Sequence, residues 1–232
     1  MFERAHHRRI HAVLCDMDPD FLRSAGCCFA GGTCLALQLG EYRESVDIDF
    51  LCASTAGYRA IRSTVSEASL GDLFRIAPRL LREVRADRYG IRTVVDVEGV
   101  PIRFEVVREG RIPIHCEAVA PLPVPILCRT DLFAEKLLAN CDRWADRSTF
   151  ARDALDILVM SAHWGPIPAR ALEVATGAYG PAIATAFEGA TRVLADDTAY
   201  RNRCFEALSV SPEAQAVVLA QLGRIEVRQG EA

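Results

Sequence analysis

The chain has 232 residues, half of them hydrophobic and a quarter charged, and a formal net charge of -4. This is the composition of an ordinary globular protein, long enough for one large domain or two small ones with a real core. The acidic balance excludes a strongly basic protein that coats nucleic acid, although a local basic patch is allowed. The sequence has no signal peptide and no run of about 18 apolar residues, so we expect a cytoplasmic protein without membrane contact.

Nine cysteines are scattered along the sequence. None forms a C-x-x-C pair, and no group of cysteines and histidines has zinc-binding spacing. Most lie in apolar runs such as Cys27-Cys28-Phe29-Ala30. We therefore expect reduced, buried cysteines in a reducing cytosol.

The first half of the chain alternates short helical and strand patterns, separated by glycines and turn residues. Its predicted elements are helices at 2–15, 19–24, 33–39 and 58–69 and strands at 27–30, 46–52, 83–89, 91–97 and 102–108. In the strand at 46–52, apolar residues face one side, while Asp47 and Asp49 face the other.

The second half is predicted to be helical. Three prolines in five positions first make residues 119–127 an extended connector. Helices are then expected at 130–144, 150–163, 168–177, 180–194, 198–208 and 211–228. The sequence therefore predicts an α+β protein in which the helical domain completes a ligand-binding cleft. Its parts are an α/β domain at 1–118, a Pro-rich connector at 119–128 and a helical domain at 129–232.

The stretch with the clearest chemistry covers residues 29–50 and is predicted as strand, Gly31-Gly32 turn, helix and strand. The glycines let the backbone approach a ligand, and the free N–H groups of the helix that follows form an anion site. Asp47 and Asp49 project from one face of the next strand, where two close carboxylates repel each other unless a cation lies between them. A phosphate site beside a divalent-metal site is what transfer from a nucleoside triphosphate requires.

In this stretch the sequence resembles the AbiEii/AbiGii-type nucleotidyltransferases. They are a branch of the DNA polymerase β-like superfamily that includes the MenT toxins of toxin–antitoxin systems. The motifs that carry the resemblance are Gly31-Gly32-Thr33 and Arg43-Glu44-Ser45-Val46-Asp47-Ile48-Asp49-Phe50. The resemblance implies a mixed sheet with flanking helices, followed by an all-helical lobe. It also implies Mg²⁺ or Mn²⁺ held by the two aspartates, with the nucleotide close to Gly31, Gly32, Thr33 and Ser45.

The superfamily carries a third acidic residue on a later strand. Glu105, in Arg103-Phe104-Glu105-Val106-Val107, is the preferred candidate because it lies on the later strand of a predicted hairpin. Asp96 is the competitor. The resemblance thus implies Asp47, Asp49 and Glu105 as metal ligands.

A second family region has a lysine on one helix and an Arg-Asp-x-x-Asp motif on the next. Lys136 fits the first position, and it is the only lysine beside 26 arginines. This bias fits a place that needs a compact ammonium, so the resemblance implies a catalytic, phosphate-binding role. Asp153 and Asp156 share one helix face. They are expected to orient Lys136, to hold the base or ribose, or to pair with Arg152 and Arg143.

Other charged residues are given simpler interpretations. His6, His7 and His11 lie on a polar N-terminal helix and are expected to be solvated. The arginines between residues 75 and 92 are interleaved with acids, which favours a salt-bridged surface, with an RNA-backbone patch as the alternative.

The resemblance implies a metal-dependent, pyrophosphate-releasing enzyme that moves a nucleoside monophosphate from a nucleoside triphosphate to an acceptor hydroxyl. A toxin acting on RNA is expected, with the tRNA 3′ end as the leading acceptor and an antitoxin protein as partner. One alternative is a small-molecule nucleotidyltransferase similar to the aminoglycoside-modifying enzymes. The other is a nucleotide-binding module without catalysis that acts through a protein partner, against which the intact Asp-x-Asp pair argues.

Overall fold

The computed structural model describes residues 2–230, with side chains for residues 2–224. The chain divides into two compact units. The α/β unit comprises Met1–Leu37 and Ser45–Arg129, and the helical unit comprises Gln38–Glu44 and Thr130–Ala232. A short segment of the N-terminal half, which includes Arg43, therefore belongs to the helical unit.

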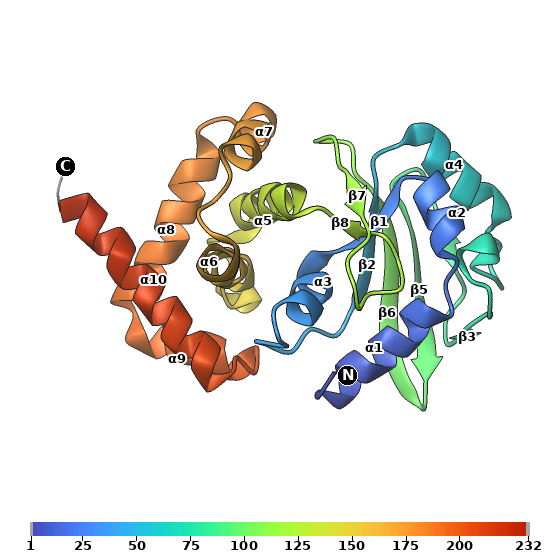
Figure 1. Cartoon of the computed structure of the whole chain (residues 1–232), viewed down its shortest axis with the longest axis horizontal. Helices are drawn as coiled ribbons and strands as arrows, with labels where there is room; N and C mark the ends of the chain where they lie inside the picture. The colour runs from blue at the N-terminus through green and yellow to red at the C-terminus, as the bar shows by residue number, and fades with distance from the viewer. Residues whose placement is uncertain (1, 231–232) are drawn as a thin grey trace. The chain divides into compact units, whose positions relative to one another are not determined.

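Within the described residues, the α/β unit is built on one mixed sheet of eight strands (Figure 1). The strands are β1 (Cys27–Ala30), β2 (Ile48–Cys52), β3 (Arg79–Leu80), β4 (Arg85–Ala86), β5 (Gly90–Val97), β6 (Val100–Arg108), β7 (Cys116–Glu117) and β8 (Ile126–Leu127). Their order is β3-β5-β6-β2-β1-β8-β7, and β4 pairs with β5. Strand β2 runs antiparallel to β1 and parallel to β6.

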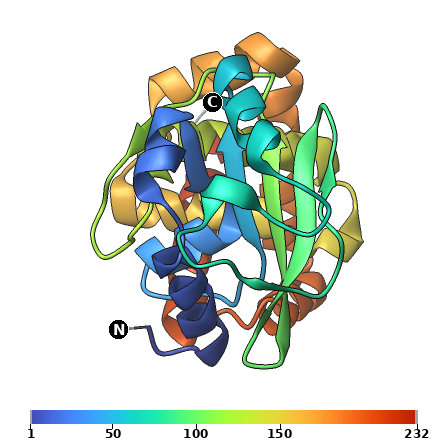
Figure 2. The same ribbon diagram turned by 90° about the vertical axis from the view of Figure 1, so that its right-hand side faces the viewer.

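Helices cover both faces of this sheet. One face, turned toward the viewer in Figure 2, carries α1 (Ala5–Cys15), α2 (Pro19–Ser24) and α4 (Thr55–Thr64), while α3 (Gly31–Gln38) lies on the other. The core under the first three helices contains Phe50, whose ring centroid lies 5.4 Å from that of Phe29 and 5.9 Å from that of Phe104. Because side chains alternate along a strand, burying Phe50 turns Asp49 to the opposite face.

The second unit contains six helices among the described residues, which confirms the expected helical lobe. Its helices are α5 (Arg129–Arg143), α6 (Arg152–Trp164), α7 (Ala169–Tyr179), α8 (Ala182–Asp196), α9 (Thr198–Ala207) and α10 (Pro212–Gly230). Helices α6, α8 and α10 pack on one another. The segment 38–44 joins them through backbone hydrogen bonds from Glu44 N to Leu208 O at 3.0 Å and from Ser211 N to Tyr42 O at 2.8 Å. Within residues 2–230, no helix has both the length and the apolar character needed to cross a membrane.

Several expected elements differ from the observed ones. The Pro-rich stretch contains a strand, β8, which joins β1 because Phe29 N donates to Pro125 O at 2.8 Å. A proline cannot donate a ladder hydrogen bond, but its carbonyl still accepts one. Residues 83–89 are mostly irregular and contain only the short strand β4. Helix α4 begins earlier than expected, since Ser54 caps it by accepting a 3.0 Å bond from Gly57 N.

The expectation that all cysteines are reduced is wrong for Cys28 and Cys116, which form a disulfide. Their Cα atoms lie 5.4 Å apart although 88 residues separate them in sequence. Strand β8 brings them together, since it pairs with β1 on one side and with β7 on the other. This pairing depends on sheet topology, so the cysteine spacing carried no sign of it.

Candidate active site

Strands β2 and β6 bring three carboxylates of the α/β unit together. Asp49 and Glu105 are direct partners in the parallel register of these strands, and Asp47 immediately precedes β2. Neighbouring strands lie about 4.8 Å apart, so the three side chains share one small area of the sheet. The side chains of Asp47 and Glu105 are 33% and 20% exposed, which leaves both open to a ligand.

Arg103 lies close to two of these carboxylates, and its pKa reflects their negative charge. Its guanidinium lies 3.0 Å from Glu105 Oε1 and 3.9 Å from Asp47 Oδ2. The hydrogen bond to Glu105, followed by the charge of Asp47, raises the pKa of Arg103. The same side chain is 62% exposed, so the carboxylates are covered by a solvated cation and not by the core.

Gly31 lies directly against Asp49 at the start of α3. Its φ angle of +73° falls in the left-handed region, and a Cβ atom added there would lie 2.7 Å from Asp49 Oδ2. Both facts require glycine. Helix α3 therefore begins with its first backbone N–H groups beside the carboxylates, in the place where a helix binds anions.

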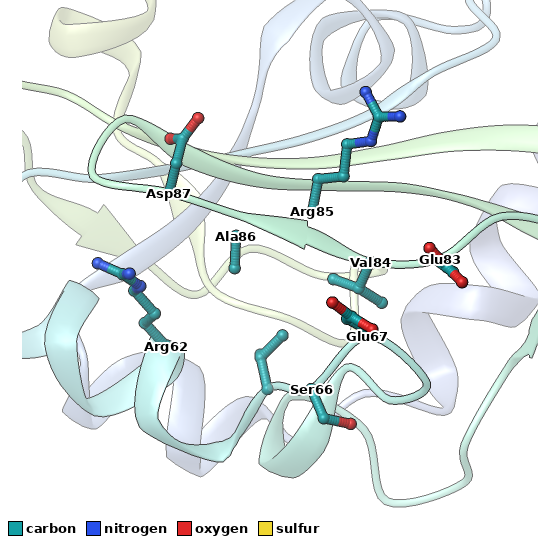
Figure 3. A pocket seen from close by; sticks show the side chains of 9 residues that line it. Arg62, Ser66, Glu67, Glu83, Val84, Arg85, Ala86 and Asp87 are labelled. Atoms are coloured by element: carbon teal, nitrogen blue, oxygen red, sulfur yellow. The ribbon is translucent and has the colours of Figure 1, made fainter.

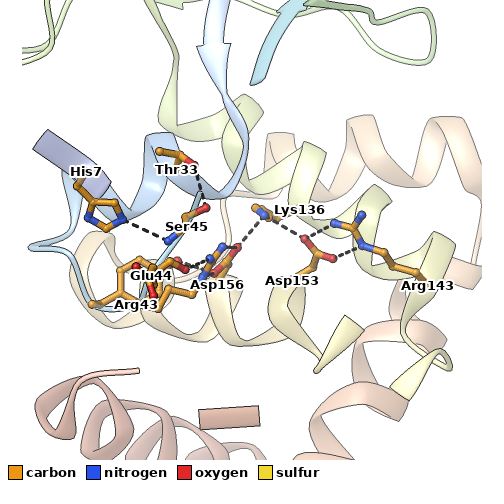
Figure 4. Close-up of polar contacts among 10 residues, drawn as sticks. His7, Thr33, Arg43, Glu44, Ser45, Lys136, Arg143, Asp153 and Asp156 are labelled. Carbon is orange, nitrogen blue, oxygen red and sulfur yellow. Dashed lines mark hydrogen bonds and ion pairs between the residues drawn. The ribbon is translucent and has the colours of Figure 1, made fainter. Parts of the chain in front are cut away.

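Buried polar groups hold the segment that carries Asp47 (Figure 4). Thr33 is fully buried, donates to the Asp47 carbonyl oxygen at 2.5 Å and shares a 2.8 Å hydrogen bond with Ser45 Oγ. The backbone N–H of Ser45 donates to His7 Nε2 at 3.2 Å. This bond requires an unprotonated Nε2, and it fixes the backbone two residues before Asp47.

The expectation that His7 is solvated is wrong, because this side chain is fully buried. The residues that α1 buries are His7, Ile10, Val13 and Leu14. Their spacing is that of one helix face, so helical periodicity could have placed His7 on the buried side.

The helical unit contains a second polar cluster, centred on Asp156 (Figure 4). Arg43 binds this fully buried carboxylate with two hydrogen bonds, Nε to Oδ1 at 2.7 Å and Nη2 to Oδ2 at 2.8 Å. The hydroxyl of Tyr42 donates to Oδ1, and Lys136 Nζ lies 2.7 Å from Oδ2. The segment 38–44 is thus tied to α6 by a buried ionic contact.

Asp153, one turn earlier on α6, extends this cluster. It accepts hydrogen bonds from Lys136 Nζ at 3.0 Å and from Arg143 Nε at 2.6 Å. Burial alone would raise the pKa of Asp153, but the charges of Lys136 and Arg143 outweigh it and hold the pKa below its usual range. Burial likewise opposes ionisation of Asp156, and the charges of Arg43 and Lys136 lower its pKa.

The predicted site residues therefore fall into two groups. Six of them meet in the α/β unit, namely Gly31, Thr33, Ser45, Asp47, Asp49 and Glu105. The other three, Lys136, Asp153 and Asp156, meet in the helical unit.

The alternatives considered for these roles lie elsewhere or have other partners. The competitor Asp96 pairs with Arg79 at 3.1 Å and lies opposite Pro101, four residues from Glu105 on β6. Within residues 2–224, Arg152 forms no ion pair with Asp153 or Asp156, while Arg143 does. The sequence motif alone gives Arg43 no partner, and the structure shows that it pairs with Asp156.

The three carboxylates offer the donor atoms of a divalent-metal site, although their oxygen atoms do not all lie within 4.8 Å of one another. Asp47, Asp49 and Glu105 offer oxygen atoms, which are the ligands that Mg²⁺ and Mn²⁺ prefer. Gly31 keeps the space beside Asp49 free of a side chain.

The mixed sheet with these carboxylates defines a nucleotidyltransferase-like fold. The structure is similar to JHP933 from Helicobacter pylori, with a TM-score of 0.56 and 14% identity over 100% of this chain and 96% of that one. It is also similar to a Helicobacter pylori protein proposed to be a nucleotidyltransferase, with a TM-score of 0.54 and 15% identity over 97% and 95% of the two chains. At these identities the likeness shows the fold alone.

The family follows from the sequence. The model of the nucleotidyl transferase AbiEii toxin family, of type IV toxin–antitoxin systems, matches residues 13–216, and the chain belongs to this family. The protein is accordingly a nucleotidyltransferase, as the motif had indicated, and its family implies a nucleoside triphosphate substrate and a cognate antitoxin. None of the curated proteins matches the sequence.

Proposed function

We propose that the protein transfers a nucleoside monophosphate from a nucleoside triphosphate to a hydroxyl group of RNA, with the tRNA 3′ end as the leading acceptor. The observation that carries the transfer step is the direct pairing of Asp49 with Glu105 across β2 and β6, with Asp47 beside them. The RNA acceptor is supported by the toxin family of the chain.

Asp47, Asp49 and Glu105 would hold Mg²⁺ or Mn²⁺, which when bound neutralises charge on the phosphates and favours ionisation of the acceptor hydroxyl. The first N–H groups of α3, at Gly31 and Gly32, bind the terminal phosphates. Glu105 accepts the hydroxyl proton as the oxygen bonds to the α-phosphorus. The bond from the α-phosphorus to the leaving oxygen breaks, and pyrophosphate departs.

We also propose a phosphate-binding role for Lys136, which occupies the lysine position of the motif. Asp153 and Asp156 orient its Nζ, at 3.0 Å and 2.7 Å. The proposed substrates are cytoplasmic molecules, and we propose the same compartment for the enzyme.

The test is incubation of the purified protein with Mg²⁺, each of the four α-³²P-labelled nucleoside triphosphates in turn, and total tRNA. Asp47→Ala/Asp49→Ala is the inactive variant, and Asp72→Ala, an exposed carboxylate of the same unit, is the matched control. Label in RNA that only the double variant abolishes supports the proposal. Label in aminoglycosides but not in RNA would establish the small-molecule enzyme. Bound nucleotide without transfer to either would indicate the partner-dependent module.

A further inference from the structure

The α/β unit has a concave site at the end of the sheet, separate from the carboxylates. A cavity of about 230 Å³ is lined by Thr55, Tyr58, Arg59, Arg62, Arg88 and Arg108. Four of its six lining residues are arginines, and none is acidic. The arginines come from α4, from the turn between β4 and β5, and from the end of β6.

Among the described residues, these four arginines have no salt-bridge partner, although Arg62 acts electrostatically on Asp87. Within residues 2–224, none forms an ion pair with a carboxylate, whereas Arg43, Arg103, Arg111 and Arg143 all do. The acidic residue on the adjacent turn, Asp87, is already engaged, by Arg92 at 3.7 Å and by the Tyr89 N–H at 2.7 Å. In a chain of net charge -4, unpaired guanidinium groups that converge on one cavity indicate an anionic ligand.

The walls of the cavity are fixed by hydrogen bonds. Arg108 Nη2 donates to Thr55 Oγ1 at 3.0 Å, which holds the end of β6 against the start of α4. The Tyr58 hydroxyl donates to Asp87 O at 2.6 Å, which holds α4 against the β4–β5 turn. The arginines are thus presented from a preformed concave surface.

An exposed aromatic side chain lies next to Arg88, one of the residues that line this cavity. Tyr89 is 57% exposed, and the guanidinium carbon of Arg88 lies 4.5 Å from the centre of its ring. Arginines that track a backbone beside an aromatic ring on which a base can stack are the combination that binds single-stranded nucleic acid. This feature favours RNA over a protein partner or a small anion.

A second cavity, of about 570 Å³, shares Arg62 with the first (Figure 3). Its lining also includes the carboxylates of Glu67, Glu83 and Asp87, so it does not favour a polyanion. The proposed RNA contact is therefore confined to the four-arginine cavity.

We propose that the four-arginine cavity binds backbone phosphates of the acceptor RNA upstream of the reacting 3′ end; this rests on the proposed function. Register gives the distance scale, because Asp49 pairs with Glu105 and Cys52 pairs with Arg108. Three residue steps along β6 span about 10 Å, the rise of roughly three stacked nucleotides. Arg108 leaves the sheet on the face opposite Glu105, so the strand passes around the end of the sheet to reach both.

This geometry makes the contribution of the cavity depend on acceptor length. The path around the end of the sheet is longer than the distance of about 10 Å along β6. A trinucleotide with the CCA sequence of tRNA 3′ ends is therefore too short to reach the arginines, whereas a whole tRNA reaches them. The test variant is Arg59→Gln/Arg62→Gln/Arg88→Gln/Arg108→Gln. The control loses the same charge from the exposed arginines of the helical unit, as Arg170→Gln/Arg192→Gln/Arg203→Gln/Arg224→Gln. Arg59→Glu alone, on the exposed face of α4, is a second variant in case the fourfold one does not fold.

For the test variant, the expected tRNA affinity at low salt is at least about tenfold weaker, and the slope of log K against log salt is smaller by about 2 to 3. The KM for tRNA should rise by about the same factor, with kcat unchanged and the KM for the trinucleotide unchanged. Equal tRNA affinity and salt slope in test and control variants would overturn the proposal. A competition experiment with two polyanions of equal charge gives a second criterion. If polyglutamate displaced tRNA from the wild-type protein as effectively as oligouridine, the proposal would also be overturned. If the wild-type enzyme labels no RNA, the proposed function fails. The tRNA affinities of the test and control variants still show whether the cavity binds RNA.

Discussion

Asp49 and Asp156 both belong to the acidic motifs of this sequence, but their surroundings differ. Asp49 shares a partly exposed area of the sheet with Glu105, and Arg103 is the solvated cation beside them. Asp156 is fully buried and bound by Arg43 and Lys136 at 2.7 Å each. One carboxylate group thus has capacity left for a ligand, and the other is already neutralised by the protein.

The difference separates two uses of charge. A buried ion needs its partner, because removing one member leaves the other desolvated and unpaired. The helical cluster therefore determines how the segment 38–44 packs on α6. The carboxylates of the sheet are partly solvated, so they contribute little to stability and are accessible to a cation. Replacing equivalent residues in the two groups should therefore affect different properties.

The largest expected effect is on catalysis. Asp49→Asn should lower nucleotide transfer by about 10³-fold or more, because a lost metal ligand removes several kcal/mol of transition-state stabilisation. The midpoint of thermal unfolding should stay near the wild-type value, since Asn is nearly isosteric. Labelled-nucleotide transfer and calorimetry on the same sample measure the two effects. A large fall in the unfolding midpoint would show that Asp49 has a structural role, and Asp49 would then not differ from Asp156 in this respect.

Asp156→Ala should have the opposite profile and reduce stability first. Leaving Arg43 and Lys136 buried without their carboxylate is expected to cost about 3 to 5 kcal/mol. Urea unfolding measures this cost, and Asp196→Ala, an exposed aspartate of the same unit, is the matched control with a change within about 0.5 kcal/mol. Equal midpoints for the two variants would mean that the buried contact contributes nothing.

Gly31→Ala tests the close approach to Asp49, and Gly40→Ala is its control. Both glycines have positive φ angles, +73° and +71°, but a Cβ atom at position 40 meets nothing within 4 Å. Each variant should therefore lose about 1 kcal/mol of stability from backbone strain. Only Gly31→Ala should also lower transfer activity, because it displaces the Asp49 carboxylate. Equal activity in both variants would show that the carboxylate has room to move.

The smallest expected effect is a dependence on pH. The pKa of Asp153 is below its usual range when the protein is folded, so its ionised form contributes stability above the unfolded value of about 3.9. That contribution is lost as the pH falls from about 4 toward the lower folded pKa. Unfolding free energies below pH 4 should fall more steeply for wild type than for Asp153→Asn. Parallel profiles would contradict the ionic role of Asp153.

Much of the fold could be predicted from the sequence. The periodicity around Asp47 and Asp49 indicated a strand with two faces, and the C-terminal helices followed from their apolar spacing. These patterns are local. The disulfide between Cys28 and Cys116 and the strand β8 depend on long-range strand pairing, which no local pattern records.

The candidate site shows the same limit. The resemblance named Asp47, Asp49 and Glu105, and the β2–β6 register shows why the last two are neighbours. The contact of Arg43 with Asp156 joins residues 113 positions apart, so only the folded helical unit reveals it. The polarity of His7 predicts a solvated side chain, whereas its position on the buried face of α1 determines where it lies.

The most direct test of the contrast is a titration of the protein with Mn²⁺, followed by electron paramagnetic resonance of the free ion. Wild type and Asp153→Asn should bind Mn²⁺ with the same affinity, whereas Asp49→Asn should bind it at least about tenfold more weakly. Equal Mn²⁺ affinity for wild type and Asp49→Asn would contradict the assignment of the open carboxylates as the metal site.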